Sequence, residues 1–258
     1  MKKPRIIFFD IDGTLIDMEK RRITSEMTET LQKLQKNGIR ICIATGRAPI
    51  AVPEFSGVEF DAFVTFNGSC CYSREEPIFS TPLDREDVQK IVRNAAEISR
   101  PVSVATKTRI ASNGSDADLV QYYAFGNRKV EIAEDFEEQA AGEVYQMMMG
   151  CRVEDYPQIL KGTKHAKIAA WWDRATDIIP TGSGKGIGIR KILEYYGIDR
   201  SEAMAFGDGN NDIEMFEAVG HGVAMGNASA DLKAIAEAVC KSAAEDGIYH
   251  YCREKGLI

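Results

Sequence analysis

Three short apolar segments near the start of the chain, two of them separated by an amphipathic segment, limit the folds that it can adopt. Residues 5–9, 39–44 and 62–66 are rich in β-forming apolar side chains, and each segment ends at a polar turn. Such runs are typical of strands buried on both faces of a sheet. Residues 24–38 carry apolar side chains at helical spacing and end at Asn-Gly. A strand, helix, strand order with short connections predicts a parallel sheet covered by helices.

Between about residues 82 and 179 the pattern changes to short strands mixed with helices. The predicted elements are helices at 84–99, 116–125 and 156–161 and strands at 102–104, 109–111, 144–149, 167–172 and 175–179. Asp173 and Arg174 favour a hairpin turn between the last two strands. Trp171 and Trp172 would point to opposite faces of their strand.

Beyond residue 180 the alternation of strands and helices returns. The predicted elements are helices at 185–196, 212–219, 230–240 and 247–255 and strands at 203–206 and 222–225. We therefore expect one α/β domain, formed by residues 1–81 and 180–258, that is interrupted by an α+β domain at residues 82–179.

Two acidic residues directly follow the first predicted strand. Asp10 and Asp12 are two positions apart, so their carboxylates project the same way in extended backbone. Gly13 allows a sharp turn after them. Ligands of open α/β sheets bind at the carboxyl ends of strands, and two like charges this close repel unless a cation or a shared proton offsets them. A surface turn does not need this arrangement, so the pair predicts a reactive or metal-binding site.

A second acidic segment, Gly-Asp-Gly-Asn-Asn-Asp, stands after another predicted strand and contains Asp208 and Asp212. Hard cations such as Mg²⁺ prefer carboxylate oxygens, so these acids could complete a site that Asp10 begins. The segment is not an EF-hand loop, because Ile213 occupies the position of the required glycine and Val219 that of the closing glutamate. A helix cap without further role remains the alternative.

Two more segments at strand or helix ends could bind phosphate. Thr45 and Gly46 follow the strand at 39–44 and offer a hydroxyl and a backbone amide. Lys185 opens a predicted helix after Gly-Ser-Gly, where its amine could neutralise a phosphate or an acidic pair. The Walker spacing is absent, because Ile179 and Gly186 stand where glycine and a hydroxyl residue are required. Taken alone, either segment could equally be a surface loop.

Taken in the order of the chain, the four motifs resemble those of the haloacid dehalogenase (HAD) superfamily of phosphohydrolases: Asp10–Thr14 is the first, Thr45–Arg47 the second, Lys185 the third and Gly207–Asp212 the fourth. The insert between the second and third motifs, and the pair Asn67 and Gly68, resemble the Cof-type branch with a C2 cap. The resemblance implies an α/β fold: a Rossmann-like parallel-sheet core with an inserted α+β cap of the C2 type. Residues 82–179 would be the cap, which determines substrate specificity.

The resemblance also implies a Mg²⁺ ion and an aspartyl-phosphate intermediate. It assigns Asp10 as nucleophile and Asp12 as general acid and base, Thr45, Gly46, Lys185 and Asn211 as phosphate-binding residues, and Asp10, the Asp12 backbone carbonyl, Asp208 and Asp212 as the metal site, with Asp212 acting through water or a neighbouring ligand. Candidate substrate contacts in the cap are Lys107, Arg109, Tyr122, Tyr123, Lys164, His165 and Trp172, although a surface or core role in the cap is the simpler explanation of each.

The composition limits the partners. The net charge is −7 and no block of Lys and Arg stands out, which argues against nucleic acid or an anionic membrane surface. No apolar run approaches the roughly 20 residues of a membrane span. Six cysteines without a C-x-x-C pair suit reduced thiols in the cytoplasm. The expected partner is a small phosphorylated metabolite, and we expect a monomer or a weak homodimer.

Three functions remain open at this stage. The first is a phosphatase acting on sugar phosphates, with pyridoxal phosphate or flavin mononucleotide as other substrates. The second is a phosphohexomutase on the same core. The third is a non-catalytic sensor of phosphorylated metabolites, although Asp10 and Asp12 are both present.

Overall fold

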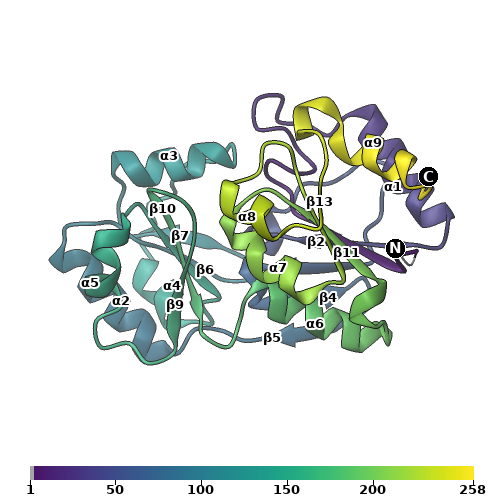
Figure 1. The fold of residues 1–258 in the computed structure, drawn as a ribbon. Coiled ribbons are helices and arrows are strands. Elements are labelled where there is room, and N and C mark those ends of the chain that lie inside the picture. Colours follow the sequence, from purple (N-terminus) through teal and green to yellow (C-terminus); the bar gives the residue numbers. More distant parts are fainter. Residues whose placement is uncertain (1–2) are drawn as a thin grey trace. The chain divides into compact units, whose positions relative to one another are not determined.

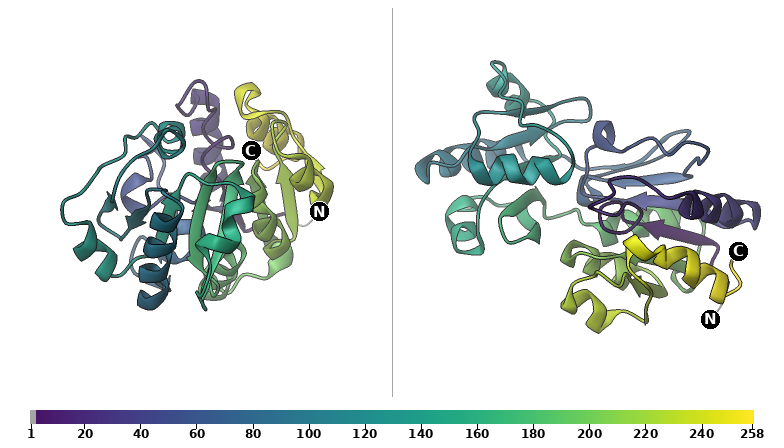
Figure 2. Two further views of the ribbon diagram at one scale, coloured as in Figure 1. Left: turned by 90° about the vertical axis from the view of Figure 1, so that its left-hand side faces the viewer. Right: turned by 90° about the horizontal axis from the view of Figure 1, so that it is seen from above.

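The computed structural model describes residues 3–258, which separate into two compact units (Figures 1 and 2). The first unit contains the chain up to Thr45, Pro53–Phe79 and Lys185–Ile258, and the second contains Gly46–Val52 and Ser80–Gly184. The chain thus leaves the first unit and later returns to it. The functional division into a core at 1–81 and 180–258 and a cap at 82–179 stays a prediction.

The first unit is built on one sheet with β1 near its centre. The strand order is β13 (Ala238–Val239), β12 (His221–Ala224), β11 (Ala203–Gly207), β1 (Ile6–Phe9), β2 (Arg40–Ala44), β3 (Ala62–Thr65), β4 (Cys70–Ser73) and β5 (Pro77–Ser80). Neighbours from β13 to β3 are parallel, and β4 turns back antiparallel to β3. The carboxyl ends of β11, β1, β2 and β3 therefore share one edge of the sheet, which is where ligands of such folds bind.

Helices cover both faces of this sheet. They are α1 (Ser25–Lys36), α6 (Lys185–Tyr196), α7 (Ile213–Ala218), α8 (Ala230–Ile235) and α9 (Gly247–Glu254). The α1 and α9 helices contact each other on one face, and α6 and α7 contact each other on the opposite face (Figure 1). The α1 helix begins where the Thr24 hydroxyl accepts a hydrogen bond from the Met27 amide at 3.1 Å. The cover on both faces explains why β1 is completely buried.

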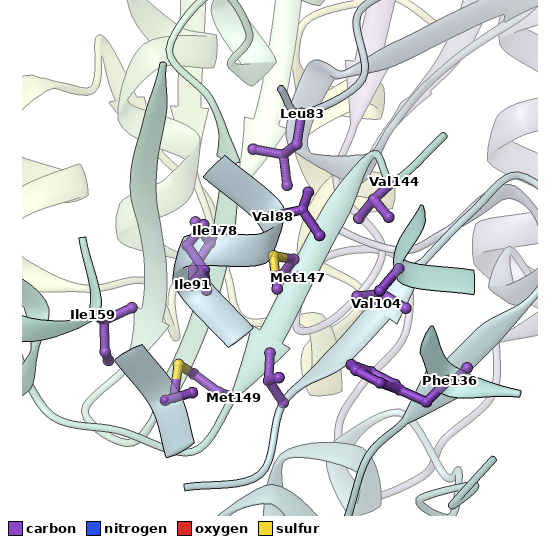
Figure 3. Packing of buried hydrophobic residues seen from close by; sticks show 14 of the residues in the cluster. Leu83, Val88, Ile91, Val104, Phe136, Val144, Met147, Met149, Ile159 and Ile178 are labelled. Atoms are coloured by element: carbon purple, nitrogen blue, oxygen red, sulfur yellow. The ribbon is translucent and has the colours of Figure 1, made fainter. Parts of the chain in front are cut away.

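The second unit has an antiparallel sheet of its own. The strand order is β7 (Ile110–Ser112), β6 (Ser103–Ala105), β8 (Gln146–Met149), β10 (Ala175–Pro180) and β9 (Ala166–Trp172), and the helices are α2 (Arg85–Glu97), α3 (Ala117–Phe125), α4 (Phe136–Ala141) and α5 (Tyr156–Ile159). Apolar residues of α2, α4 and α5 pack against one face, with Val104, Met147 and Ile178 of the sheet (Figure 3). The α3 helix contacts β8 and β10, and its Tyr122 donates a hydrogen bond to Asp177, the neighbour of Ile178. Successive strand residues face opposite ways, so α3 lies on the other face.

The predicted fold class is confirmed: a central parallel sheet lies between helices, and a separate antiparallel sheet is inserted. The helix predicted at 230–240 is wrong in its second half, because α8 ends at Ile235 and β13 then pairs with β12 at the sheet edge. The sequence analysis also missed β4, β5 and α4. Among the helices formed within residues 3–258, none combines the length and apolar character that a transmembrane segment needs.

The prediction for the two tryptophans is also wrong. Trp172 pairs with Ala175, whereas Ala170 pairs with Thr176, so the register shifts at Trp171. This bulge breaks the alternation of the strand. Both indole rings consequently pack against Phe125, with centroid distances of 5.4 Å for Trp171 and 4.9 Å for Trp172.

Candidate active site

Three carboxylates meet at the carboxyl edge of the parallel sheet. Asp10 follows β1, and Asp208 and Asp212 follow β11, which is paired with β1 from Ile6 to Phe9. One oxygen from each of the three carboxylates lies within 4.8 Å of the others. Residues about 200 positions apart in the sequence are thus brought together by neighbouring parallel strands.

The amine of Lys185 lies between two of these carboxylates. It is 2.7 Å from Asp10 Oδ1 and 2.6 Å from Asp212 Oδ1, and the side chain is fully buried at the start of α6. Burial alone would lower the pKa of this amine, but the two carboxylates together raise it above its ordinary value. Lys185 therefore stays charged and neutralises part of the acidic cluster.

Asp212 holds the loop before α7 in place. Its Oδ2 accepts hydrogen bonds from the backbone amides of Asp208 at 2.9 Å and Gly209 at 3.0 Å, while its Oδ1 accepts from Lys185. These bonds engage both carboxylate oxygens of a side chain that is buried. Asp212 is therefore placed to orient Asp208 and Lys185.

The turn after β1 presses against Asp208. The Thr14 hydroxyl donates to Asp208 Oδ1 at 2.9 Å. Gly13 has φ +83°, and a Cβ atom at this position would overlap the Asp208 carboxylate. Only glycine fits both the backbone conformation and the space.

The electrostatics of the cluster favour a bound cation. Burial raises the pKa of Asp10 to about 7. The charges of Asp212 and Asp12 also raise this pKa, whereas Lys185 lowers it. Burial, Asp10 and Asp212 raise the pKa of Asp208 well above its usual range. The single positive charge of Lys185 does not neutralise the three carboxylates, whose oxygen atoms are the candidate metal ligands. This donor set fits a hard divalent cation such as Mg²⁺.

Two predicted phosphate-binding residues are connected through the turn that follows β3. Thr45 is buried at the end of β2, and its carbonyl accepts a hydrogen bond from the Asn67 amide at 3.0 Å. The Asn67 Oδ1 in turn accepts from Asn211 Nδ2 at 3.3 Å. Gly46 belongs to the second unit, where its carbonyl accepts a hydrogen bond from Gln146 Nε2 at 3.1 Å. Its predicted contact with phosphate therefore stays a prediction.

Sequence reasoning missed Asn227. Its Nδ2 donates to the Gly13 carbonyl at 2.8 Å and lies 3.4 Å from Asp208 Oδ2, while its Oδ1 accepts from the Ala243 amide at 3.0 Å. Asn227 thus links the two acidic motifs to the segment before α9. Asn227 could have been predicted from its position, because it lies three residues after the end of the parallel strand β12.

Several candidate substrate contacts of the insert have structural partners in the second unit. Arg109 forms ion pairs with Glu131 at 3.1 Å and with Asp135. Tyr122 donates a hydrogen bond to the buried Asp177 carboxylate at 2.5 Å. Burial, and to a smaller extent the charge of Asp177, raise the pKa of the Tyr122 phenol well above its usual range. These contacts agree with the simpler explanation, a role in the packing of the insert.

The chain belongs to the haloacid dehalogenase-like hydrolase family, whose model matches residues 7–252. Within the family it is a phosphatase of the capped Cof-type branch, and the predicted family and enzyme class, a phosphoric monoester hydrolase, are confirmed by its relatives.

Three relatives support this assignment. YkrA of Bacillus subtilis (strain 168), named as a candidate phosphatase, is 33% identical over 256 residues, with 98% of each chain covered. The 5-amino-6-(5-phospho-D-ribitylamino)uracil phosphatase YitU of the same organism is 29% identical over 272 residues, covering 98% of this chain and 97% of its own. The solved structure of BT4131, a HAD subclass IIB sugar phosphatase, is 33% identical, has a TM-score of 0.90, and matches 98% of this chain and 100% of its own.

Proposed function

We propose that the chain is a Mg²⁺-dependent phosphatase of small phosphate monoesters, with sugar phosphates as its substrate class. The observation that carries the proposal is the convergence of Asp10, Asp208 and Asp212, two of which, Asp10 and Asp212, contact the buried amine of Lys185. The activity in the name of BT4131 and the phosphoribityl substrate in the name of YitU support the substrate class. Six free thiols support a reducing compartment such as the cytoplasm.

In this proposal the reaction begins at Asp10. Its carboxylate attacks the phosphorus atom and forms an aspartyl-phosphate, while Asp12 protonates the leaving oxygen of the alcohol. Asp12 then removes a proton from the water that hydrolyses the aspartyl-phosphate. Asp10, Asp208 and the backbone carbonyl of Asp12 would hold Mg²⁺, which screens the repulsion between the carboxylate and the phosphate.

The remaining residues of the site bind and orient the phosphate group. Lys185, Thr45, the Gly46 amide and Asn211 would hold the transferring oxygens where negative charge develops. Asp212 acts through its neighbours, because its oxygens already accept hydrogen bonds from Asp208, Gly209 and Lys185.

The inserted residues 82–179 would act as the cap that selects the substrate. An apolar core of its own, including Val88, Met147 and Ile178, supports its treatment as a separate folding unit. Closure of such a cap would exclude bulk water from the reacting groups.

The test compares the parent chain with Asp10→Ala on a generic aryl phosphate, with Mg²⁺ present. We expect turnover to fall by at least about a thousandfold, because the nucleophile is lost. Asp231→Ala, which removes an exposed acid of the first unit, serves as the matched control and should keep parental turnover. Asp10→Ala turnover close to that of the parent would refute the nucleophile.

The substrate class is tested by phosphate release from a panel of sugar, nucleotide and cofactor phosphates. Release from sugar phosphates at the highest kcat/KM supports the proposal. Interconversion of hexose 1- and 6-phosphates without release would instead identify a phosphohexomutase. Faster release from pyridoxal phosphate or flavin mononucleotide would replace the proposed substrate class.

A further inference from the structure

We propose that Asn67 is a positioning residue that holds Asn211 and the end of β2 in the geometry needed to bind phosphate. The inference rests on the proposed function, which places Thr45 and Asn211 at the transferring phosphate. It assigns a task to the Asn-Gly pair after β3, which the reaction scheme above leaves without one.

The first observation concerns two of the hydrogen bonds of Asn67. Its backbone amide donates to the Thr45 carbonyl at 3.0 Å, and its side-chain Oδ1 accepts from Asn211 Nδ2 at 3.3 Å. The residue is buried, with 2% of its surface exposed. Asn67 thus connects the end of β2 to the acidic segment after β11 without belonging to either.

The second observation is the backbone that presents Asn67. Phe66, Asn67 and Gly68 have φ values of +51°, +49° and +98°, so three successive residues lie in the left-handed region. This conformation is costly for a residue with a Cβ atom, above all for a bulky one, and persists only where the surroundings enforce it. Glycine would adopt the conformation of Asn67 more easily. Asparagine tolerates this conformation better than most residues, and Asn67 differs from an ordinary turn asparagine in that it is buried and its Oδ1 accepts a hydrogen bond from Asn211.

The third observation shows what holds this turn. A Cβ atom on Gly188 of α6 would lie 2.7 Å from Val64 Cγ1, 2.9 Å from Cys71 Sγ and 3.4 Å from Gly68 Cα. The helix thus packs directly on the β3–β4 hairpin and on the strained turn. The turn that carries Asn67 therefore contacts the helix that begins at Lys185, while Asn67 itself contacts Thr45 and Asn211.

Substitution by glycine separates the side chain from the backbone. Asn67→Gly removes the amide and keeps a residue suited to positive φ, so the turn should survive. We expect KM for the aryl phosphate and the dissociation constant of inorganic phosphate, measured by calorimetry, each to rise about tenfold, the loss of roughly one hydrogen bond to a phosphate-binding group. The thermal midpoint should stay within about 3 °C of the parent.

Asn127→Gly is the matched control. Asn127 is an exposed residue of the second unit with φ +53°, almost the same backbone conformation as Asn67. The same substitution there should leave KM and phosphate affinity at parental values. A loss of phosphate affinity in Asn127→Gly equal to that in Asn67→Gly would overturn the inference.

A double substitution tests whether Asn67 acts through Asn211. We expect Asn67→Gly combined with Asn211→Ala to weaken phosphate binding no more than Asn211→Ala alone, because the two side chains form one unit. Multiplication of the two separate effects would overturn this, and so would parental phosphate affinity in Asn67→Gly. Failure of the proposed function is seen separately, as absence of turnover by the unsubstituted chain on the phosphate panel.

Discussion

The Thr14 hydroxyl donates a hydrogen bond to Asp208 Oδ1 at 2.9 Å and joins two acidic motifs that lie 194 residues apart in the sequence. This hydrogen bond lowers the pKa of Asp208. Burial and neighbouring carboxylates raise the pKa of Asp208, and the hydroxyl is the group that most favours its ionised form. A metal ligand has to be ionised, so Thr14 supports the proposed metal site without needing to contact the metal itself.

Thr14→Val should weaken the binding of Mg²⁺ by about tenfold to a hundredfold, because a buried carboxylate loses its hydrogen-bond donor while the shape of the side chain is kept. Calorimetric titration with Mg²⁺ measures the change. Thr14→Ser retains the hydroxyl and should bind Mg²⁺ almost as the parent does. Equal affinity in the valine and serine variants would show that the hydroxyl contributes nothing to the metal site.

Gly13→Ala should abolish most of the activity, because its Cβ atom would overlap the Asp208 carboxylate and force the two motifs apart. Gly38→Ala provides the control. Gly38 also has a positive φ, +77°, but nothing lies within 4 Å of a Cβ atom there. Both variants carry backbone strain of about 1 kcal/mol, so only the contact differs between them. Comparable kcat/KM in the two would mean that strain, and not displacement of Asp208, decides the outcome.

The sequence predicted that Asp10, Asp208 and Lys185 lie together because their convergence depends on sheet order, and their catalytic roles stay a prediction. Asp10, Asp208 and Lys185 each stand at the end of a strand or the start of a helix, and parallel strands bring such positions to one edge. Asn227 was not predicted from the sequence because only its hydrogen bonds connect it to the site. Gly13 lies 214 residues away, and Ala243 belongs to no motif.

Local patterns also could not give features that depend on pairing with a distant strand. Residues 236–240 continue a helical pattern, yet Ala238 pairs with Val223 at the edge of the sheet. The bulge at Trp171 arises from the pairing of β9 with β10, which no alternation within β9 could reveal. The strain at Phe66 likewise has no sequence signal, since phenylalanine is a poor choice for positive φ.

Mg²⁺ should raise the thermal midpoint of the parent chain, because an ion that binds only the folded state stabilises it. The gain is about 2.7 kcal/mol at a concentration one hundred times the dissociation constant. The measurement is a melting curve with and without Mg²⁺ at constant ionic strength, in protein first treated with a chelator, which should also remove the activity. Asp208→Asn should lose the shift, whereas Asp231→Asn, at an exposed acid that interacts with Asn210, should retain it. A full shift in Asp208→Asn would place the ion elsewhere.

Lys185→Met should destabilise the chain in metal-free buffer by about 3–5 kcal/mol, because it leaves Asp10 and Asp212 buried without the cation that lies 2.7 Å and 2.6 Å from them. Urea denaturation followed by circular dichroism measures the loss. Lys191→Met is the control on the same helix, since its exposed pair with Glu194 at 3.0 Å is worth less than about 1 kcal/mol. Added Mg²⁺ should restore part of the stability of Lys185→Met, because the ion would bind Asp10 and Asp208 and return positive charge to the acidic cluster. If Lys185→Met and Lys191→Met unfold at the same urea concentration, the buried amine is not what balances the acidic cluster.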